Sequence, residues 1–157
     1  MKKVLFVCMG NICRSPSAEA VMNKKILDKN LEKFLKTDSA GSIAYHEGEP
    51  ADARMKKHAA KRGYNLTSIA RKFVFDDFEH FDYIIAMDNS NYMDILTLDS
   101  KKKYRHKISL MTDYSQNGYK EVPDPYYGGN EGFELVLDIL EESVNGLINR
   151  IMEEDEI

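Results

Sequence analysis

The chain opens with a strand, a short loop and a helix in immediate succession, and this unit constrains the fold more than any other feature. Residues 3–7 form a short apolar run, which is typical of a strand buried on both faces of a sheet. Residues 16–29 then carry apolar side chains at helical spacing. A strand that leads through a helix to the next strand pairs in parallel by a right-handed crossover, so the unit predicts an α/β fold.

The same alternation continues along the rest of the chain. Further strands are expected at 34–39, 82–87 and 107–110, and further helices at 51–62, 89–98 and 133–151. The segments 41–50 and 113–130 are expected to be loops, because glycine and proline interrupt them. The sequence therefore predicts a small doubly wound parallel sheet of four strands with helices on both faces, within a single domain spanning residues 1–157.

The loop after the first strand joins a cysteine to an arginine at a fixed spacing. Cys8 ends the strand, Arg14 follows after five residues, and Ser15-Pro16 can open a helix. Gly10 and Asn11 permit a turn that points backbone N–H groups at one spot, and such a nest at a helix N-terminus binds anions and favours a thiolate. Ligands bind beyond the carboxyl ends of parallel strands, which is where this loop is expected.

Each residue of this loop also has an ordinary structural explanation. A lone cysteine is often a small buried apolar residue, an arginine is often a surface charge, and Ser-Pro often only caps a helix. Together these explanations leave the Cys-x5-Arg-Ser spacing to coincidence. The loop is therefore interpreted as a phosphate-binding loop in which Cys8 attacks phosphorus and Arg14 holds the phosphate oxygens.

Composition excludes several other classes of protein. The 157 residues are 43% hydrophobic and 31% charged, which is typical of a globular chain with its own core. The formal net charge of −4 argues against a nucleic-acid binder, and no apolar run is long enough to cross a bilayer. The two cysteines form no disulfide framework, and the N-terminus lacks a signal-peptide pattern, so a cytoplasmic protein is expected.

A second candidate for catalysis lies far along the chain. Breaking a phosphate ester requires a proton donor for the leaving oxygen. Asp124 is the best candidate, because prolines on both sides stiffen its loop and Tyr126 and Tyr127 follow it. The alternative is that Asp-Pro only makes a turn. The tyrosines are expected to wall a crevice for an aromatic leaving group.

With Cys-x5-Arg-Ser at 8–15 and Asp-Pro-Tyr-Tyr at 124–127, the chain resembles the low-molecular-weight protein tyrosine phosphatases. The resemblance covers nearly the whole chain. It includes the segments 38–41 (Asp-Ser-Ala-Gly), 48–54, 81–84 and 87–91.

The resemblance implies a role for each matching residue. Cys8 would form a phosphocysteine intermediate, Arg14 would stabilise the transition state, and Ser15 would donate a hydrogen bond to the Cys8 sulfur. Asp124 would be the general acid and then the general base. The resemblance further implies a supporting loop, with Asn11 held in its turn by Ser39, and a crevice. The supporting residues of the phosphate loop are Met9, Gly10, Asn11, Ile12, Cys13 and Ser39, and the crevice residues are Tyr45, Tyr126 and Tyr127.

The resemblance also implies partners and regulation. The substrates would be phosphotyrosine-containing proteins or small aryl phosphates, with inorganic phosphate as a product. No cofactor and no metal would be needed, and the chain would be a monomer or a weak dimer. Cys13 would be a second thiol near Cys8, which predicts redox regulation. One residue departs from the family pattern, because Ser68 stands where a histidine usually supports the loop.

Three other interpretations remain open. An arsenate reductase of the same fold would share the loop, but its relay needs more than the two cysteines present. A non-catalytic phosphate-binding module would need Arg14 but not Cys8 together with Asp124. A zinc site at Cys8 and Cys13 is disfavoured, because the chain's histidines lack the usual ligand spacing. Asp88 follows the third strand at its carboxyl end, so it could contact the phosphate loop or only cap the next helix; the cap is favoured, and Asp88 is left out of the catalytic set.

Overall fold

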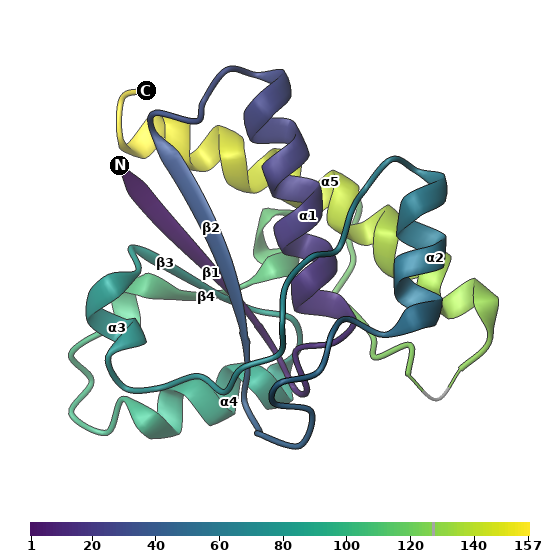
Figure 1. The fold of residues 1–157 in the computed structure, drawn as a ribbon. Coiled ribbons are helices and arrows are strands. Elements are labelled where there is room, and N and C mark those ends of the chain that lie inside the picture. Colours follow the sequence, from purple (N-terminus) through teal and green to yellow (C-terminus); the bar gives the residue numbers. More distant parts are fainter. Residues whose placement is uncertain (127) are drawn as a thin grey trace.

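The computed structural model describes residues 1–126 and 128–157, and its centre is a parallel sheet of four strands. The strands are β1 (Lys2–Cys8), β2 (Leu35–Gly41), β3 (Tyr83–Ala86) and β4 (Ile108–Leu110). Their order is β2-β1-β3-β4, and every neighbouring pair is parallel (Figure 1). This sheet confirms the predicted fold class.

Helices cover both faces of the sheet. The helices are α1 (Arg14–Asp28), α2 (Ala53–Lys61), α3 (Asp77–His80), α4 (Asn89–Leu98) and α5 (Asn130–Glu154), with 3₁₀ turns at Arg105–Lys107 and Met111–Tyr114. Helices α1, α2 and α5 lie on one side of the sheet, and α3 and α4 lie on the other (Figure 1). Among the described helices, none combines the length and apolar character needed to cross a membrane.

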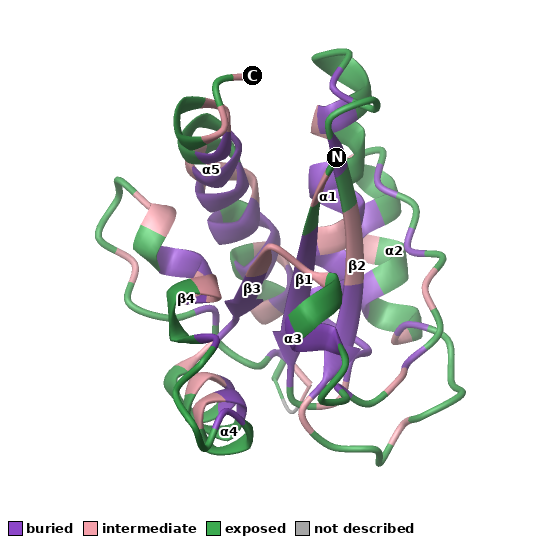
Figure 2. Ribbon diagram, turned by 90° about the vertical axis from the view of Figure 1, so that its left-hand side faces the viewer, coloured by how far each residue is buried: buried purple, intermediate pink, exposed green. Residues whose placement is uncertain are grey.

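The central strand β1 supplies both cores by alternation. Val4 and Phe6 point into the core shared with α1 and α5, whereas Leu5 and Val7 point into the core shared with α3 and α4. All four side chains are fully buried, as the purple colour of β1 shows (Figure 2). The continuous apolar run in the sequence is therefore explained by burial on both faces.

The connections place the end of β1 at the switch point of the sheet. The chain passes from β1 through α1 to β2 on one side, and later returns to β3 on the other side of β1. Cys8 is the last residue of β1 and pairs in register with Gly41. The loop between Cys8 and α1 consequently lies beyond the carboxyl ends of the strands, where α/β sheets bind ligands.

Three features differ from the sequence-based expectation. Helix α3 was not expected, because a single turn is too short to show helical periodicity. The expected loop 113–130 begins inside a 3₁₀ turn, Met111–Tyr114, and ends where α5 starts at Asn130. Helix α2 starts at Ala53 rather than at residue 51, because the Asp52 carboxylate caps it by accepting from the backbone N–H groups of residues 54 and 55.

Candidate active site

The phosphate loop, residues 8–15, folds around the sulfur of Cys8. The backbone N–H of Asn11 donates to Sγ at 3.3 Å, and the Ser15 hydroxyl lies 3.0 Å from Sγ. Cys8 is 2% exposed, so the two groups replace water at the sulfur. Hydrogen bonds donated to a sulfur stabilise its thiolate form, which is the reactive form. The N-terminus of α1, directly after the loop, adds to that stabilisation.

Asn11 makes the sharp turn in the loop. Its φ is +59°, a left-handed conformation that asparagine tolerates better than most residues. Its side-chain amide nitrogen donates to the Ser15 hydroxyl at 2.8 Å, and its side-chain oxygen accepts from the backbone N–H of Arg71 at 3.0 Å. Asn11 therefore links Ser15, which bonds to the Cys8 sulfur, to Arg71, sixty residues further along the chain.

Gly10 lies in close contact with His46. A Cβ atom at this position would lie 2.9 Å from Cδ2 of His46, so a side chain would displace that ring. His46 also bonds to Glu49 at 2.6 Å. The phosphate loop is thereby packed against the 41–50 loop through an imidazole that the sequence analysis did not assign to the site.

Arg14 is buried under the loop and points its guanidinium toward the pocket. Its Nη1 donates to Asp88 Oδ2 at 2.6 Å and to the carbonyl of Val122 at 3.0 Å. These contacts orient the other edge of the guanidinium, Nε and Nη2, which can face two phosphate oxygens. Burial alone would lower the pKa of Arg14, but the charges of Cys8 and Asp88 outweigh burial and raise it. Arg14 therefore stays charged.

Asp88, for which a helix cap was favoured from the sequence, both caps α4 and contacts Arg14. One carboxylate oxygen does cap α4 by accepting from the Asn91 N–H at 2.8 Å, and the other holds Arg14. Asn91 is 1% exposed, and with its amide oriented to satisfy both neighbours it donates to Asp88 and accepts from the Met9 N–H at 3.3 Å. The position of Asp88 at the end of β3 was the signal in the sequence for this role.

Asp124 lines the same pocket as Cys8. Its Oδ2 is 3.7 Å from Arg14 Nη2, and its Oδ1 accepts from the backbone N–H of Tyr126 at 3.0 Å. The side chain is 30% exposed, so it borders solvent as well as the pocket. The structure therefore brings together the three residues assigned from the sequence to catalysis, Cys8, Arg14 and Asp124, at one pocket.

The pocket has a volume of about 430 Å³, and both the phosphate loop and the predicted crevice line it. Its lining includes Met9, Gly10, Ile12, Cys13, Ile43, Tyr45, His46 and Tyr126. The His46 ring lies between the two tyrosines, 4.7 Å from the Tyr45 ring centre and 5.8 Å from the Tyr126 ring centre. Tyr45 is 81% exposed and so can reorient. Tyr127 was also assigned to the crevice, but it lies outside the described residues.

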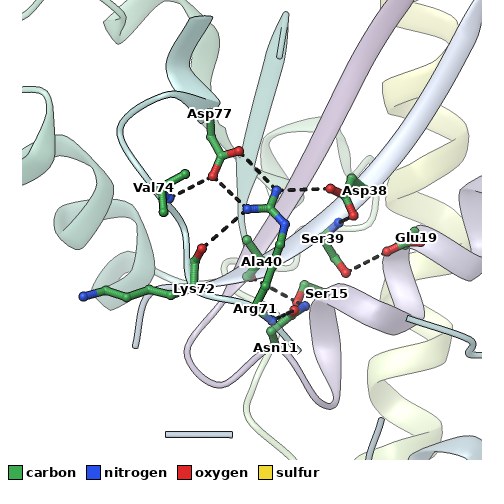
Figure 3. Close-up of polar contacts among 10 residues, drawn as sticks. All are labelled: Asn11, Ser15, Glu19, Asp38, Ser39, Ala40, Arg71, Lys72, Val74 and Asp77. Atoms are coloured by element: carbon green, nitrogen blue, oxygen red, sulfur yellow. Dashed lines mark hydrogen bonds and ion pairs between the residues drawn. The ribbon is translucent and has the colours of Figure 1, made fainter. Parts of the chain in front are cut away.

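Ser39 does not support Asn11 in the way that the resemblance implied. It pairs in register with Phe6 on β1, and its hydroxyl donates to Glu19 of α1 at 2.7 Å (Figure 3). Burial raises the pKa of Glu19, and the hydrogen bond from Ser39 opposes that rise. Ser39 therefore contacts α1. The side-chain oxygen of Asn11 accepts instead from the backbone N–H of Arg71.

Two further residues complete the surroundings of the loop. Cys13 is 4% exposed, and burial, with the Asp52 and Cys8 charges, raises the pKa of its thiol. Ser68 Oγ is shielded from solvent and has no hydrogen-bond partner among the residues that the structure describes. Within residues 1–126 and 128–157, no three His, Cys, Asp or Glu side chains cluster closely enough to hold a metal ion.

Comparisons with known proteins agree with this geometry. The model of the family described as low molecular weight phosphotyrosine protein phosphatase matches residues 3–156. A putative low molecular weight protein-tyrosine-phosphatase of Synechocystis is 47% identical over 153 residues, covering 97% of this chain and 98% of the relative.

Solved structures extend the likeness to the fold. A protein tyrosine phosphatase from Entamoeba histolytica superposes with a TM-score of 0.94 at 49% identity, covering all of both chains. A Drosophila arginine phosphatase has a TM-score of 0.87 at 33% identity, covering 96% of this chain and 97% of the other. The fold is thus shared by proteins named as phosphatases of two different side chains, tyrosine and arginine.

Proposed function

The chain belongs to the low molecular weight phosphotyrosine protein phosphatase family, and on that premise we propose that it hydrolyses phosphotyrosine in proteins and small aryl phosphates. One observation carries the proposal: the Cys8 sulfur, the Arg14 guanidinium and the Asp124 carboxylate line the same pocket. A nucleophile, an anion binder and a proton donor are the groups that this reaction needs. The non-catalytic binding module and the zinc site do not require all three, and the arsenate reductase relay needs more than the two cysteines present.

In the first step the Cys8 thiolate attacks phosphorus, and the bond from phosphorus to the tyrosyl oxygen breaks. Arg14 and the backbone N–H groups of the loop stabilise the charge spread over the other phosphate oxygens. Asp124 donates its proton to the leaving oxygen.

In the second step water attacks the phosphocysteine, and Asp124 accepts a proton from that water. The bond from sulfur to phosphorus breaks, and Cys8 leaves as a thiolate. The Ser15 hydroxyl, 3.0 Å from the sulfur, stabilises the negative charge that returns to it. Inorganic phosphate is released, and the enzyme returns to its starting state.

The proposed substrate class predicts a preference that can be measured. We expect kcat/KM for a phosphotyrosine peptide to exceed that for the matched phosphoserine peptide at least about tenfold, because ring contacts in the crevice add ~0.5–1.5 kcal/mol and an aryl oxide leaves more easily. A matched phosphoarginine peptide is the third arm, since a Drosophila arginine phosphatase shares the fold. Equal or higher kcat/KM for phosphoserine or phosphoarginine would contradict the proposal.

We also propose redox control through Cys8 and Cys13, which are both free and buried at the same pocket. Hydrogen peroxide oxidises the Cys8 thiolate to a sulfenic acid, as the O–O bond breaks and hydroxide leaves. The Cys13 sulfur then displaces water from that sulfenic acid and forms a disulfide. A dithiol reduces the disulfide and restores the thiolate.

This proposal predicts different recovery in two proteins. After mild peroxide treatment, wild-type activity is expected to return on addition of a dithiol, whereas Cys13→Ser loses activity irreversibly as Cys8 oxidises further. The measurement is the recovered fraction of the initial rate, with inorganic phosphate as a protecting ligand in the control. Equal recovery in both proteins would show that Cys13 does not protect Cys8.

A further inference from the structure

Three charged residues that do not line the pocket, Asp38, Arg71 and Asp77, form a cluster that we call the Arg71 cluster. The guanidinium bonds to both oxygens of Asp77, at 3.0 Å and 3.2 Å. Its Nη2 also donates to Asp38 Oδ2 at 3.1 Å (Figure 3). The cluster joins β2, α3 and the segment between α2 and α3.

The geometry of the cluster is that of a strong interaction. Asp77 is 5% exposed, and its Oδ2 also accepts from the backbone N–H of Val74 at 2.8 Å. Burial alone would lower the pKa of Arg71, but the hydrogen bonds and charge of Asp77 outweigh burial and raise it. A two-point bond between a guanidinium and a buried carboxylate fixes both position and direction, unlike an exposed ion pair.

The backbone of Arg71 lies between this cluster and the phosphate loop. Its N–H donates to Asn11 Oδ1 at 3.0 Å, and its carbonyl accepts from the Gly41 N–H at 2.8 Å. Ser68, in the same segment, has a shielded hydroxyl with no partner among the described residues. The neighbouring backbone is also held, because the Ala70 N–H donates to the Glu49 carbonyl and the Phe73 N–H donates to the Gly41 carbonyl, both at 2.8 Å. The Arg71 side chain adds an anchor to β2 and α3, and it is the one that a substitution can remove.

A short series of hydrogen bonds leads from that N–H to the sulfur. Asn11 accepts from Arg71 and donates to the Ser15 hydroxyl at 2.8 Å. The single proton of Ser15 can then point to Cys8 Sγ at 3.0 Å or to the Ala40 carbonyl at 3.4 Å. The Asn11 amide occupies one lone pair of the hydroxyl, so it helps to set which acceptor Ser15 serves.

We infer that Arg71 is a positioning residue for catalysis: its ion pairs with Asp77 and Asp38 hold Asn11, and through Asn11 they hold the Ser15 hydroxyl on the Cys8 sulfur. The inference rests on the proposed function for its effect on turnover. Without the guanidinium, the Arg71 N–H shifts, Asn11 loosens, and Ser15 turns toward Ala40. The sulfur then loses a donor that stabilises both the attacking and the leaving thiolate.

The first test measures the thiolate without using a substrate. The rate of Cys8 alkylation by iodoacetamide is followed against pH in the wild type, Arg71→Gln, Arg71→Lys and a matched control. In Arg71→Gln we expect the alkylation rate to begin to increase at a higher pH than in the wild type. Arg71→Lys keeps the charge but lacks the planar fork that bonds both oxygens of Asp77, so an intermediate curve is expected. A curve for Arg71→Gln that overlays the wild type would overturn the inference.

The matched control is Arg62→Gln. Arg62 is also a part-buried arginine held by three carboxylates, Glu134, Asp138 and Glu141, but it joins α2 to α5 away from the pocket. Its loss is expected to lower the melting temperature and to leave the alkylation curve in place. An equal shift of the curve in both variants would mean that general destabilisation is responsible, and the inference would fail.

The second test uses turnover of an aryl phosphate. In Arg71→Gln we expect kcat to fall about tenfold, the size of one weakened hydrogen bond to a charged group, while KM changes little because Arg14 still binds phosphate. In a Ser15→Ala background the same change is expected to have little further effect on kcat. Full additivity of the two losses would contradict a route through Ser15.

Failure of the inference and failure of the proposed function give different results. If the wild type hydrolyses no aryl phosphate, the proposed function fails, but the alkylation curves still test whether Arg71 acts on the sulfur. If the wild type is active and only the curves coincide, the proposed function stands and the positioning role of Arg71 is wrong.

Discussion

Cys8→Ser is expected to lose at least ~10⁴-fold in kcat on an aryl phosphate, because a serine hydroxyl stays protonated at neutral pH and is a far weaker nucleophile than a thiolate. The substitution replaces one atom, and the donors around it remain in place. These donors, the Asn11 N–H and the Ser15 hydroxyl, are positioned to serve a negative sulfur. The loss should therefore lie in the chemical step.

Two measurements separate that explanation from a general defect. Binding of inorganic phosphate, followed by calorimetry, is expected to stay close to wild type in Cys8→Ser, because Arg14 and the loop N–H groups are intact. Acid quenching during turnover of a ³²P-labelled substrate should leave label on the wild type and none on the variant. Turnover by Cys8→Ser within a hundredfold of wild type would contradict a nucleophilic role for the sulfur.

The parts of the fold that were predictable are those governed by burial. A strand covered on both faces must be apolar throughout, so the run before Cys8 and the segment 83–86 could be recognised without any long-range information. Parallel pairing then followed from the alternation with helices. Helix α3 and the 3₁₀ turns were missed because each spans about one turn and carries no period.

The candidate site divides in the same way. Cys8, Arg14 and Ser15 are close in sequence, so the turn that brings them together could be read locally. Asp88 shows the limit, because its two oxygens serve different partners and only the three-dimensional structure shows that one of them reaches Arg14. Capping and contact with the phosphate loop look like alternatives in the sequence, yet one carboxylate does both.

Ser39 shows how strand register decides a role. Ser39 on β2 is in register with Phe6 on β1, and Phe6 lies two residues before Cys8. At that position the Ser39 hydroxyl donates to Glu19 of α1. The bond to Asn11 comes instead from a backbone N–H at Arg71, and a backbone donor leaves no signature in a sequence. Functional contacts made by main-chain atoms are therefore the part of a site that sequence reasoning finds last.

Asp124→Ala is expected to slow hydrolysis by about 10²–10⁴-fold when the leaving group is a poor one, which is the usual contribution of a general acid. The loss should shrink as the leaving group becomes more acidic, because a stable aryl oxide departs without a proton. The measurement is kcat/KM over a series of substituted phenyl phosphates, plotted against the pKa of the phenol. The steep slope in the variant, against a shallow slope in wild type, is the expected signature.

Asp88→Asn is the matched control, because Asp88 and Asp124 are both carboxylates beside the Arg14 guanidinium, with Oδ2 atoms 2.6 Å and 3.7 Å from its nitrogens. Loss of the Asp88 charge weakens the hold on Arg14, and this should reduce the rate for every substrate by a similar factor. The slope should then stay near that of wild type. An equally steep slope in both variants, or equal losses across the series for Asp124→Ala, would show that Asp124 acts on Arg14 rather than on the leaving oxygen.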